Sequence, residues 1–197
     1  MVSDFSLQNI DNIILEELNE HVETSKLLYK LLPEITSFYN IIINTLRKNN
    51  KIMICGNGGS AADAQHFSSE LIGKFERVRK PLAAISLCTD TSAITSISND
   101  FSFDDIFSRQ IRGIGEKGDL LIVISTSGNS KNVLNAINIA KEKDIACIGL
   151  LGRDGGLAIK QIDSSITINS NRTCRIQEMH SIIIHLICSL IEKNTFD

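Results

Sequence analysis

Short apolar runs alternate with helix-patterned segments along this chain from residue 51 to its end. Runs of this length bounded by turn residues are typical of buried strands. Strands that alternate with helices predict a doubly wound α/β fold with a parallel sheet. We expect five strands, at 52–55, 82–87, 120–125, 146–151 and 165–168, and a loop at 99–100 after a short helix. Such sheets bind ligands beyond the carboxyl ends of their strands, where the strand order reverses.

The first fifty residues precede this alternation and have a helical pattern throughout. Apolar residues recur at helical spacing from about 8 to 32, and Pro33 fits the first turn of a second helix that runs to about Asn49. This arm either packs on its own sheet or binds another subunit. Its apolar surface, added to that of the C-terminal helix, favours a subunit partner. A chain of 197 residues is most simply one domain, with the arm at 1–50 and the core at 51–197.

Charge and cysteine usage exclude several classes of protein. The net charge is −3 and there is no basic cluster, which argues against nucleic acid or an anionic membrane as a partner. The five cysteines form no CxxC pair and are odd in number, as expected of reduced thiols in a cytoplasmic protein. Asp4 and the lack of an apolar segment around it argue against a signal peptide. The run at 182–191 is interrupted by His185 and Ser189 and is too short to span a bilayer.

Two turns rich in glycine and serine each lie between an expected strand and an expected helix. The first is GNGGS at 56–60, and the second is STSGNS at 125–130. Glycine allows positive φ and close approach of a ligand, and the following helix directs unpaired N–H groups at the turn. Hydroxyl groups beside helix N-termini predict a site for a phosphate monoester on a small polar molecule.

A dinucleotide is the less favoured ligand for the first turn. Gly56, Gly58 and Ala61 match the GxGxxA fingerprint, which requires an acidic residue at the end of the second strand. Glu76 precedes that strand, and Asp90 lies too far beyond the fingerprint. The P-loop pattern is absent because no GK[ST] follows the turn.

Polar residues with acid–base or metal chemistry occur on two expected helices. His66 and Glu70 are four residues apart and therefore share a helix face. The final helix is largely apolar but carries a polar stripe at every fourth position: Gln177, Ser181 and His185. Buried polar groups need partners, and hydrogen-bonded core histidines, His180 included, are one interpretation. A Zn²⁺ site is a second interpretation, and an acid–base pair is a third. The spacing alone does not choose among them.

Four motifs together resemble the sugar isomerase (SIS) domain family and, within it, the phosphoheptose isomerase group. They are GNGGSAADAQHFSSEL at 56–71, SND at 98–100, ISTSGNS at 124–130, and RIQEMH at 175–180 followed by His185. The serine-rich loop indicates only the wider family. The combination of His66, Glu70, Gln177 and His185 is more specific, and the resemblance covers nearly the whole chain.

The resemblance implies a flavodoxin-like five-stranded sheet and a homotetramer with its sites between subunits. The implied reaction interconverts D-sedoheptulose 7-phosphate and D-glycero-D-manno-heptose 7-phosphate through an enediol. This is the first step toward nucleotide-activated heptose for surface polysaccharide, either lipopolysaccharide or capsule.

The same resemblance assigns roles to individual residues. By motif match, the phosphate would be held by Ser60, Ser125, Thr126, Ser127 and Ser130. The sugar would be contacted by Asn57, Gly58, Gly59, Asn99, Asp100 and Gln177. One Zn²⁺ per subunit would be held by His66, Glu70, Gln177 and His185, of which Glu70 and His185 are also the implied acid–base pair. Cys174 departs from the Ala or Asp often found beside RIQE, so no substrate contact is expected there.

Two other functions fit the same fold. One is a non-catalytic protein of the type that associates with the replication initiator, but that relative lacks the catalytic carboxylate and the last-helix histidine. This chain has Glu70 and His185, and it has Ser127 where that relative carries a bulky basic residue. The other is an SIS isomerase for a different phosphosugar.

Overall fold

The computed structural model describes residues 7–194, so the prediction made from Asp4 lies outside the described residues. Within this range the strands form one five-stranded parallel sheet in the order β2-β1-β3-β4-β5. The strands are β1 (Ile52–Gly56), β2 (Ala84–Ser86), β3 (Leu120–Ser125), β4 (Ala146–Gly152) and β5 (Ser164–Ile168). The predicted α/β fold is therefore confirmed. The order reverses between β1 and β3, where a doubly wound sheet is expected to bind its ligand.

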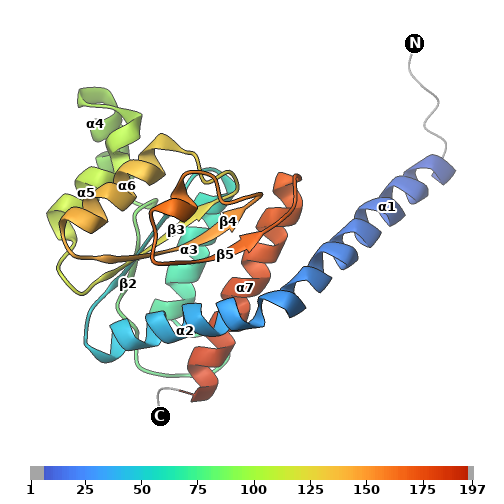
Figure 1. The fold of residues 1–197 in the computed structure, drawn as a ribbon, viewed down its shortest axis with the longest axis horizontal. Coiled ribbons are helices and arrows are strands. Elements are labelled where there is room, and N and C mark those ends of the chain that lie inside the picture. Colours follow the sequence, from blue (N-terminus) through green and yellow to red (C-terminus); the bar gives the residue numbers. More distant parts are fainter. Residues whose placement is uncertain (1–6, 195–197) are drawn as a thin grey trace.

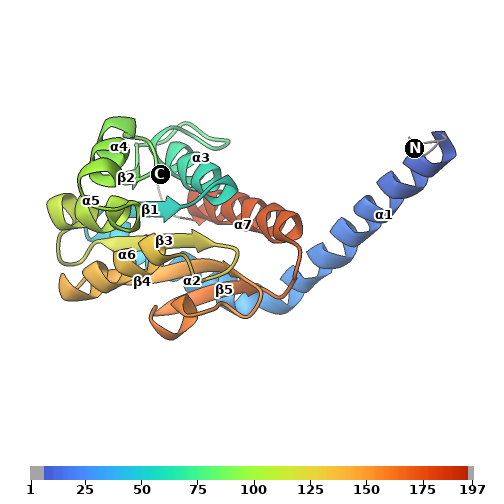
Figure 2. The same ribbon diagram turned by 90° about the horizontal axis from the view of Figure 1, so that it is seen from above.

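Helices cover both faces of the sheet (Figures 1 and 2). The α-helices are α1 (Leu7–Ser25), α2 (Leu32–Arg47), α3 (Gly59–Ile72), α4 (Thr91–Asp100), α5 (Ile106–Ile114), α6 (Lys131–Glu142) and α7 (Thr173–Asn194). Short 3₁₀ helices are η1 (Lys26–Leu31), η2 (Phe103–Asp105) and η3 (Ala158–Lys160).

Two apolar cores form because successive strand residues point to opposite faces. On one face, Ile52 and Ile54 pack in a cluster with residues of α2, α3 and α7, such as Phe67. On the other face, Met53 and Cys55 pack with residues of α5 and α6. The sheet therefore holds α3 and α7 on the same face, which brings their polar residues within reach of one another.

The N-terminal arm divides into two parts that behave differently. The face of α2 that includes Phe38 and Ile42 is buried against the sheet and α7. In contrast, α1 extends away from the body of the molecule (Figures 1 and 2). Its apolar residues are 40–56% exposed: Ile10, Ile13, Ile14, Leu15, Leu18 and Val22. The interpretation that the arm packs on its own sheet is therefore confirmed for α2, whereas α1 leaves an apolar surface exposed and its contact with another subunit stays a prediction.

Ion pairs attach the C-terminal half of α1 to the start of α7. Arg175 pairs with Glu17 at 2.5 Å and with Glu20 at 3.3 Å, and Arg172 also pairs with both carboxylates. His21 Nδ1 lies 2.8 Å from Glu178 Oε2. These contacts fix the C-terminal half of α1 beside the start of α7, and the rest of α1 projects from there.

Helix α7 is, among the described helices, the one long and apolar enough to span a membrane by length and composition, and its most apolar window is 50% buried. That burial is typical of the core helix of a folded domain. Its residues Met179, Ile183 and Ile187 are fully buried in the cluster shared with the sheet.

Three element boundaries differ from those predicted. The first helix ends at Ser25 and η1 follows, because the Thr24 and Ser25 hydroxyls bond to the Glu20 and Val22 carbonyls and so compete with the helical hydrogen bonds. The second strand pairs over only three residues at the sheet edge. The predicted loop at 99–100 is instead the last turn of α4, whose hydrogen bonds continue to the Phe101 N–H.

Candidate active site

The two predicted turns lie side by side because β1 pairs with β3. The turn at 56–60 follows β1, and the serine loop at 125–130 follows β3. The amides of Asn57 and Asn132 exchange two hydrogen bonds, each 2.9 Å long, which tie the first turn to α6. Asn132 was not predicted, although its position in the first turn of the helix after the serine loop could have indicated it.

The two glycines at the start of α3 differ in their surroundings: Gly58 is open to a ligand, and the Gln177 side chain covers Gly59. Gly58 is the N-cap of α3 with φ of 57°, and a Cβ built there would meet no atom of the described chain within 4 Å. A Cβ at Gly59 would lie 2.8 Å from Cδ of Gln177, so the Gln177 side chain lies directly over this turn. The predicted sugar contacts Gly58, Gly59 and Gln177 are therefore neighbours.

The serine loop has a shape set by its own side chains. The Oγ of Ser125 accepts the Gly128 N–H at 3.0 Å, and the Oγ of Ser127 accepts the Asn129 N–H at 3.2 Å. Asn129 Oδ1 accepts the Leu157 N–H at 2.9 Å, which anchors the loop to the turn after β4. The loop is thus fixed before any ligand binds, as suits a phosphate cradle.

His66 and His185, which are 119 positions apart in sequence, meet across the interface between α3 and α7. Their Nε2 atoms are 2.8 Å apart, and the rings are nearly perpendicular at 82°. Such a contact needs one protonated and one bare ring nitrogen. Glu70 lies one helical turn from His66, with Oε1 3.7 Å from His66 Nδ1. His66 also borders a surface hollow of about 640 Å³.

Between this imidazole pair and Gln177, the two helices share a buried polar contact. Ser181 donates its hydroxyl to Asp63 Oδ1 at 2.9 Å. Burial raises the pKa of Asp63, and the Ser181 hydrogen bond and nearby His66 offset this only in part. The Oδ2 atom of Asp63 is buried without a hydrogen-bond partner among residues 7–194. Asp63 was not predicted as a site residue.

The predicted residues Asn99 and Asp100 are placed apart from this interface. They lie on the exposed last turn of α4, where the Asn99 amide donates to Asp100 Oδ1 at 2.8 Å. Among residues 7–194, no hydrogen bond or ion pair connects either of them to another predicted site residue.

The donor set for a metal is partly assembled. Two imidazole nitrogens lie 2.8 Å apart, and ligand nitrogens of a tetrahedral Zn²⁺ site are roughly 3.3 Å apart, given Zn–N bonds of 2.0–2.1 Å. Over the described part of the chain, however, no group of three or more His, Cys, Asp or Glu side chains is placed to hold a metal ion. Gln177 lies eight residues before His185, roughly 12 Å along the helix axis.

His180 is a core histidine, as one interpretation of the sequence allowed. Its side chain is fully buried, and Nε2 lies 3.0 Å from the Leu151 carbonyl oxygen at the end of β4. Burial lowers the pKa of His180 to about 4, despite the contact with that carbonyl. Its imidazole is therefore neutral at neutral pH.

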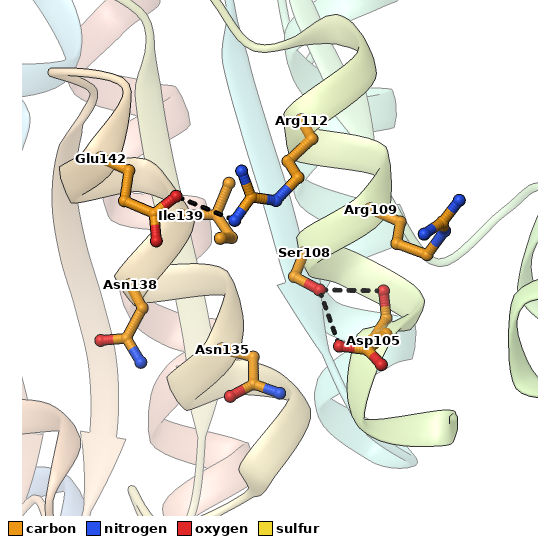
Figure 3. Close-up of a pocket in the computed structure, with 8 residues that line it drawn as sticks. All are labelled: Asp105, Ser108, Arg109, Arg112, Asn135, Asn138, Ile139 and Glu142. Carbon is orange, nitrogen blue, oxygen red and sulfur yellow. Dashed lines mark hydrogen bonds and ion pairs between the residues drawn. The ribbon is translucent and has the colours of Figure 1, made fainter. Parts of the chain in front are cut away.

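A separate polar groove of about 400 Å³ lies between α5 and α6 (Figure 3). Arg112 and Glu142 pair across it at 2.8 Å, and Ser108 bonds to Asp105. None of the predicted site residues lines this groove. The candidate active site is therefore the region formed by the two turns and the α3–α7 interface.

Comparison with known proteins agrees with this architecture. The family model of the SIS domain matches residues 21–152. The chain belongs to the SIS domain family.

Relatives that match more than 90% of this chain at 46–50% identity include phosphoheptose isomerases. The chain is 48% identical to the phosphoheptose isomerase of Helicobacter hepaticus, over 93% of this chain and 94% of that one. It is 50% identical to the phosphoheptose isomerase of Nitratiruptor sp., over 92% and 97% of the two chains. The solved phosphoheptose isomerase from Neisseria gonorrhoeae superposes with a TM-score of 0.89 at 40% identity, covering 93% of this chain and 99% of that one.

Proposed function

We propose that the chain converts D-sedoheptulose 7-phosphate to D-glycero-D-manno-heptose 7-phosphate by aldose–ketose isomerisation. The observation that carries this proposal is the linear layout of the site. The glycine turn lies at the start of α3 and the serine loop at the start of α6, side by side because β1 pairs with β3. His66 lies seven residues further along α3 from Gly59, roughly 10 Å along the helix axis, and Glu70 and His185 are its neighbours. A heptose 7-phosphate has its phosphate and its carbonyl at opposite ends, so it suits such a site. Identity of 46–50% to phosphoheptose isomerases over more than 90% of the chain supports the same substrate.

The serine loop and the glycine turn would hold the phosphate and orient the sugar. Ser60, Thr126 and Ser130 supply hydroxyls beside the first amides of α3 and α6, where the helix dipole favours an anion. Ser125 and Ser127 hold the loop in shape while facing the same ligand. Because the phosphate is remote from the reacting carbons, its binding energy serves positioning.

Glu70 and His185 would carry out the two proton transfers. One removes the proton from C1 of the ketose, and the electron pair forms the C1–C2 double bond of the enediol. The other exchanges protons with the sugar oxygens, and a proton then returns to C2 as the C1 carbonyl forms. General acid–base catalysis of this kind contributes roughly 10²- to 10⁴-fold.

His66, Glu70 and His185 are our proposed ligands for one Zn²⁺ per subunit. Gln177, the fourth ligand that the resemblance implies, lies roughly 12 Å from His185 along the helix axis. When bound, this ion would supply Lewis-acid polarisation of a sugar oxygen. The converging imidazoles support the histidine ligands most directly. The position of Gln177 over Gly59 supports its substrate role more directly than its metal role.

We further propose a homotetramer in the cytoplasm, with sites at subunit interfaces. The uncovered apolar face of α1 supports subunit contact, because exposed apolar patches of this kind mark interaction sites. The product would serve activated heptose for lipopolysaccharide or capsule.

The decisive experiment compares wild type with Glu70→Gln and His185→Ala, using sedoheptulose 7-phosphate as substrate. We expect kcat to fall at least roughly 100-fold in each variant. Pentose and hexosamine phosphates assayed alongside would expose a different phosphosugar specificity. Near-wild-type turnover in both variants would remove the assigned chemistry, and a wild type inactive on every phosphosugar would favour a non-catalytic binding role.

A further inference from the structure

A buried carboxylate near the end of α7 holds the loop at 73–80 by its backbone. Glu192 accepts the N–H groups of Phe75, Glu76 and Arg77 at 2.9, 2.8 and 2.8 Å. Its side chain is only 3% exposed. Burial alone would raise the pKa of Glu192, but the three backbone donors and Arg79 outweigh this and leave it below the ordinary value. Glu192 is therefore charged at neutral pH and anchors the loop through its backbone N–H groups.

Arg79 connects this anchor to the end of α3. Its Nε lies 3.3 Å from Glu192 Oε1. Its Nη2 donates to the Glu70 carbonyl at 2.6 Å, and its Nη1 donates to the Leu71 carbonyl at 2.8 Å. The last carbonyls of a helix lack partners within the helix, so this guanidinium stabilises the turn of α3 that carries Glu70.

The anchored loop also sets the surroundings of His185. The ring of Phe75, whose N–H is bonded to Glu192, packs against the His185 ring with centroids 5.6 Å apart. His185 is thus held between Phe75 and His66, on the same helix that carries Glu192. Both proposed proton-transfer groups have their position set by the Arg79–Glu192 pair.

We propose that Arg79 and Glu192 are positioning residues for the isomerisation, fixing Glu70 through its helix turn and His185 through Phe75. The catalytic part of this inference rests on the proposed function. The position of the His185 ring can be measured without turnover, so the positioning role and the proposed function can each be refuted separately.

A second buried carboxylate provides a matched control. Asp119 is also 3% exposed, accepts the N–H groups of Lys51 and Glu116 at 3.0 and 2.8 Å, and pairs with Lys51 Nζ at 2.5 Å. It lies at the amino ends of β1 and β3, away from the predicted site residues. Asp119→Asn therefore removes a similar charge from a similar network without touching the loop at 73–80.

The test uses Glu192→Gln, Arg79→Lys and Asp119→Asn in the full-length protein. The first readout is the ¹H–¹³C NMR spectrum of the histidine rings. The chain has four histidines, and the signals of His185 are identified as those that disappear in a His185→Gln variant. We expect Glu192→Gln and Arg79→Lys to shift the His185 signals, whereas Asp119→Asn leaves them in place. The second readout is steady-state kinetics, in which kcat should fall roughly 10- to 100-fold with KM within about twofold. Asp119→Asn should retain kcat.

Unchanged His185 signals in Glu192→Gln and Arg79→Lys would overturn the inference, as would an equal loss of kcat in Asp119→Asn. If Glu192→Gln does not fold, Arg79→Lys decides the matter, because it keeps the positive charge beside Glu192 and removes the guanidinium that bonds to the Glu70 and Leu71 carbonyls. Shifted His185 signals in a protein whose wild type isomerises no heptose phosphate would refute the proposed function and leave the positioning inference in place.

Discussion

Replacing His180 tests whether this buried histidine, which contacts the Leu151 carbonyl, is neutral in the folded protein. Its pKa is lowered to about 4 by burial, whereas an unfolded histidine titrates near 6.5. Between these values the unfolded chain binds the proton and the folded chain does not, so stability falls as pH drops. The difference amounts to about 3 kcal/mol in all, of which about 2 kcal/mol is lost by pH 5.

The assay is urea unfolding of wild type and His180→Gln between pH 5 and 7.5 at one protein concentration. Glutamine can donate to the Leu151 carbonyl as Nε2 of the imidazole can, but it does not titrate. At pH 7.5 the variant should be the less stable because it fills the site less well. By pH 5 its disadvantage should shrink by about 2 kcal/mol. Carboxylates titrate in both proteins and cancel in the comparison, so parallel pH profiles would refute this account of His180.

Three further perturbations test other parts of the site and assembly. Gly59→Ala should displace the Gln177 side chain and raise KM for the heptose phosphate, as steady-state kinetics would show. The control is Gly113→Ala, at an open position on α5, which should leave the kinetics unchanged and raise the free energy of unfolding in urea by up to about 1 kcal/mol. Dialysis against a chelator should lower kcat, and Zn²⁺ added back should restore it, with bound metal measured by atomic absorption and lost in His185→Ala. The double variant Ile14→Asp with Leu18→Asp should dissociate the oligomer in light scattering while the circular dichroism spectrum is retained.

Local pattern was enough to predict most elements. The apolar runs and glycine-rich turns identified β1 and β3 to within a residue, because strand burial and turn geometry are properties of short segments. Prediction was weaker where neighbouring segments decide the outcome. The last turn of α4, at 99–100, reads as a loop in sequence but continues a helix begun by the Asp90 cap.

The candidate site shows the same division. Motif match named His66, Glu70 and His185, and the structure brings them together. Pattern alone did not indicate Glu192, because a single glutamate near a chain end is indistinguishable from a surface charge until its partners are known. Those partners lie more than a hundred residues earlier in the chain.

By itself, the sequence determined the alternation of strands and helices, the turns suited to phosphate, and the helix faces that carry imidazole and carboxylate. Those features depend on interactions between residues a few positions apart. Only the tertiary structure decided which faces meet, because α3 and α7 come together through burial of apolar surface on one shared sheet. Contacts across 119 positions, such as that between His66 and His185, depend on that packing and on no local rule.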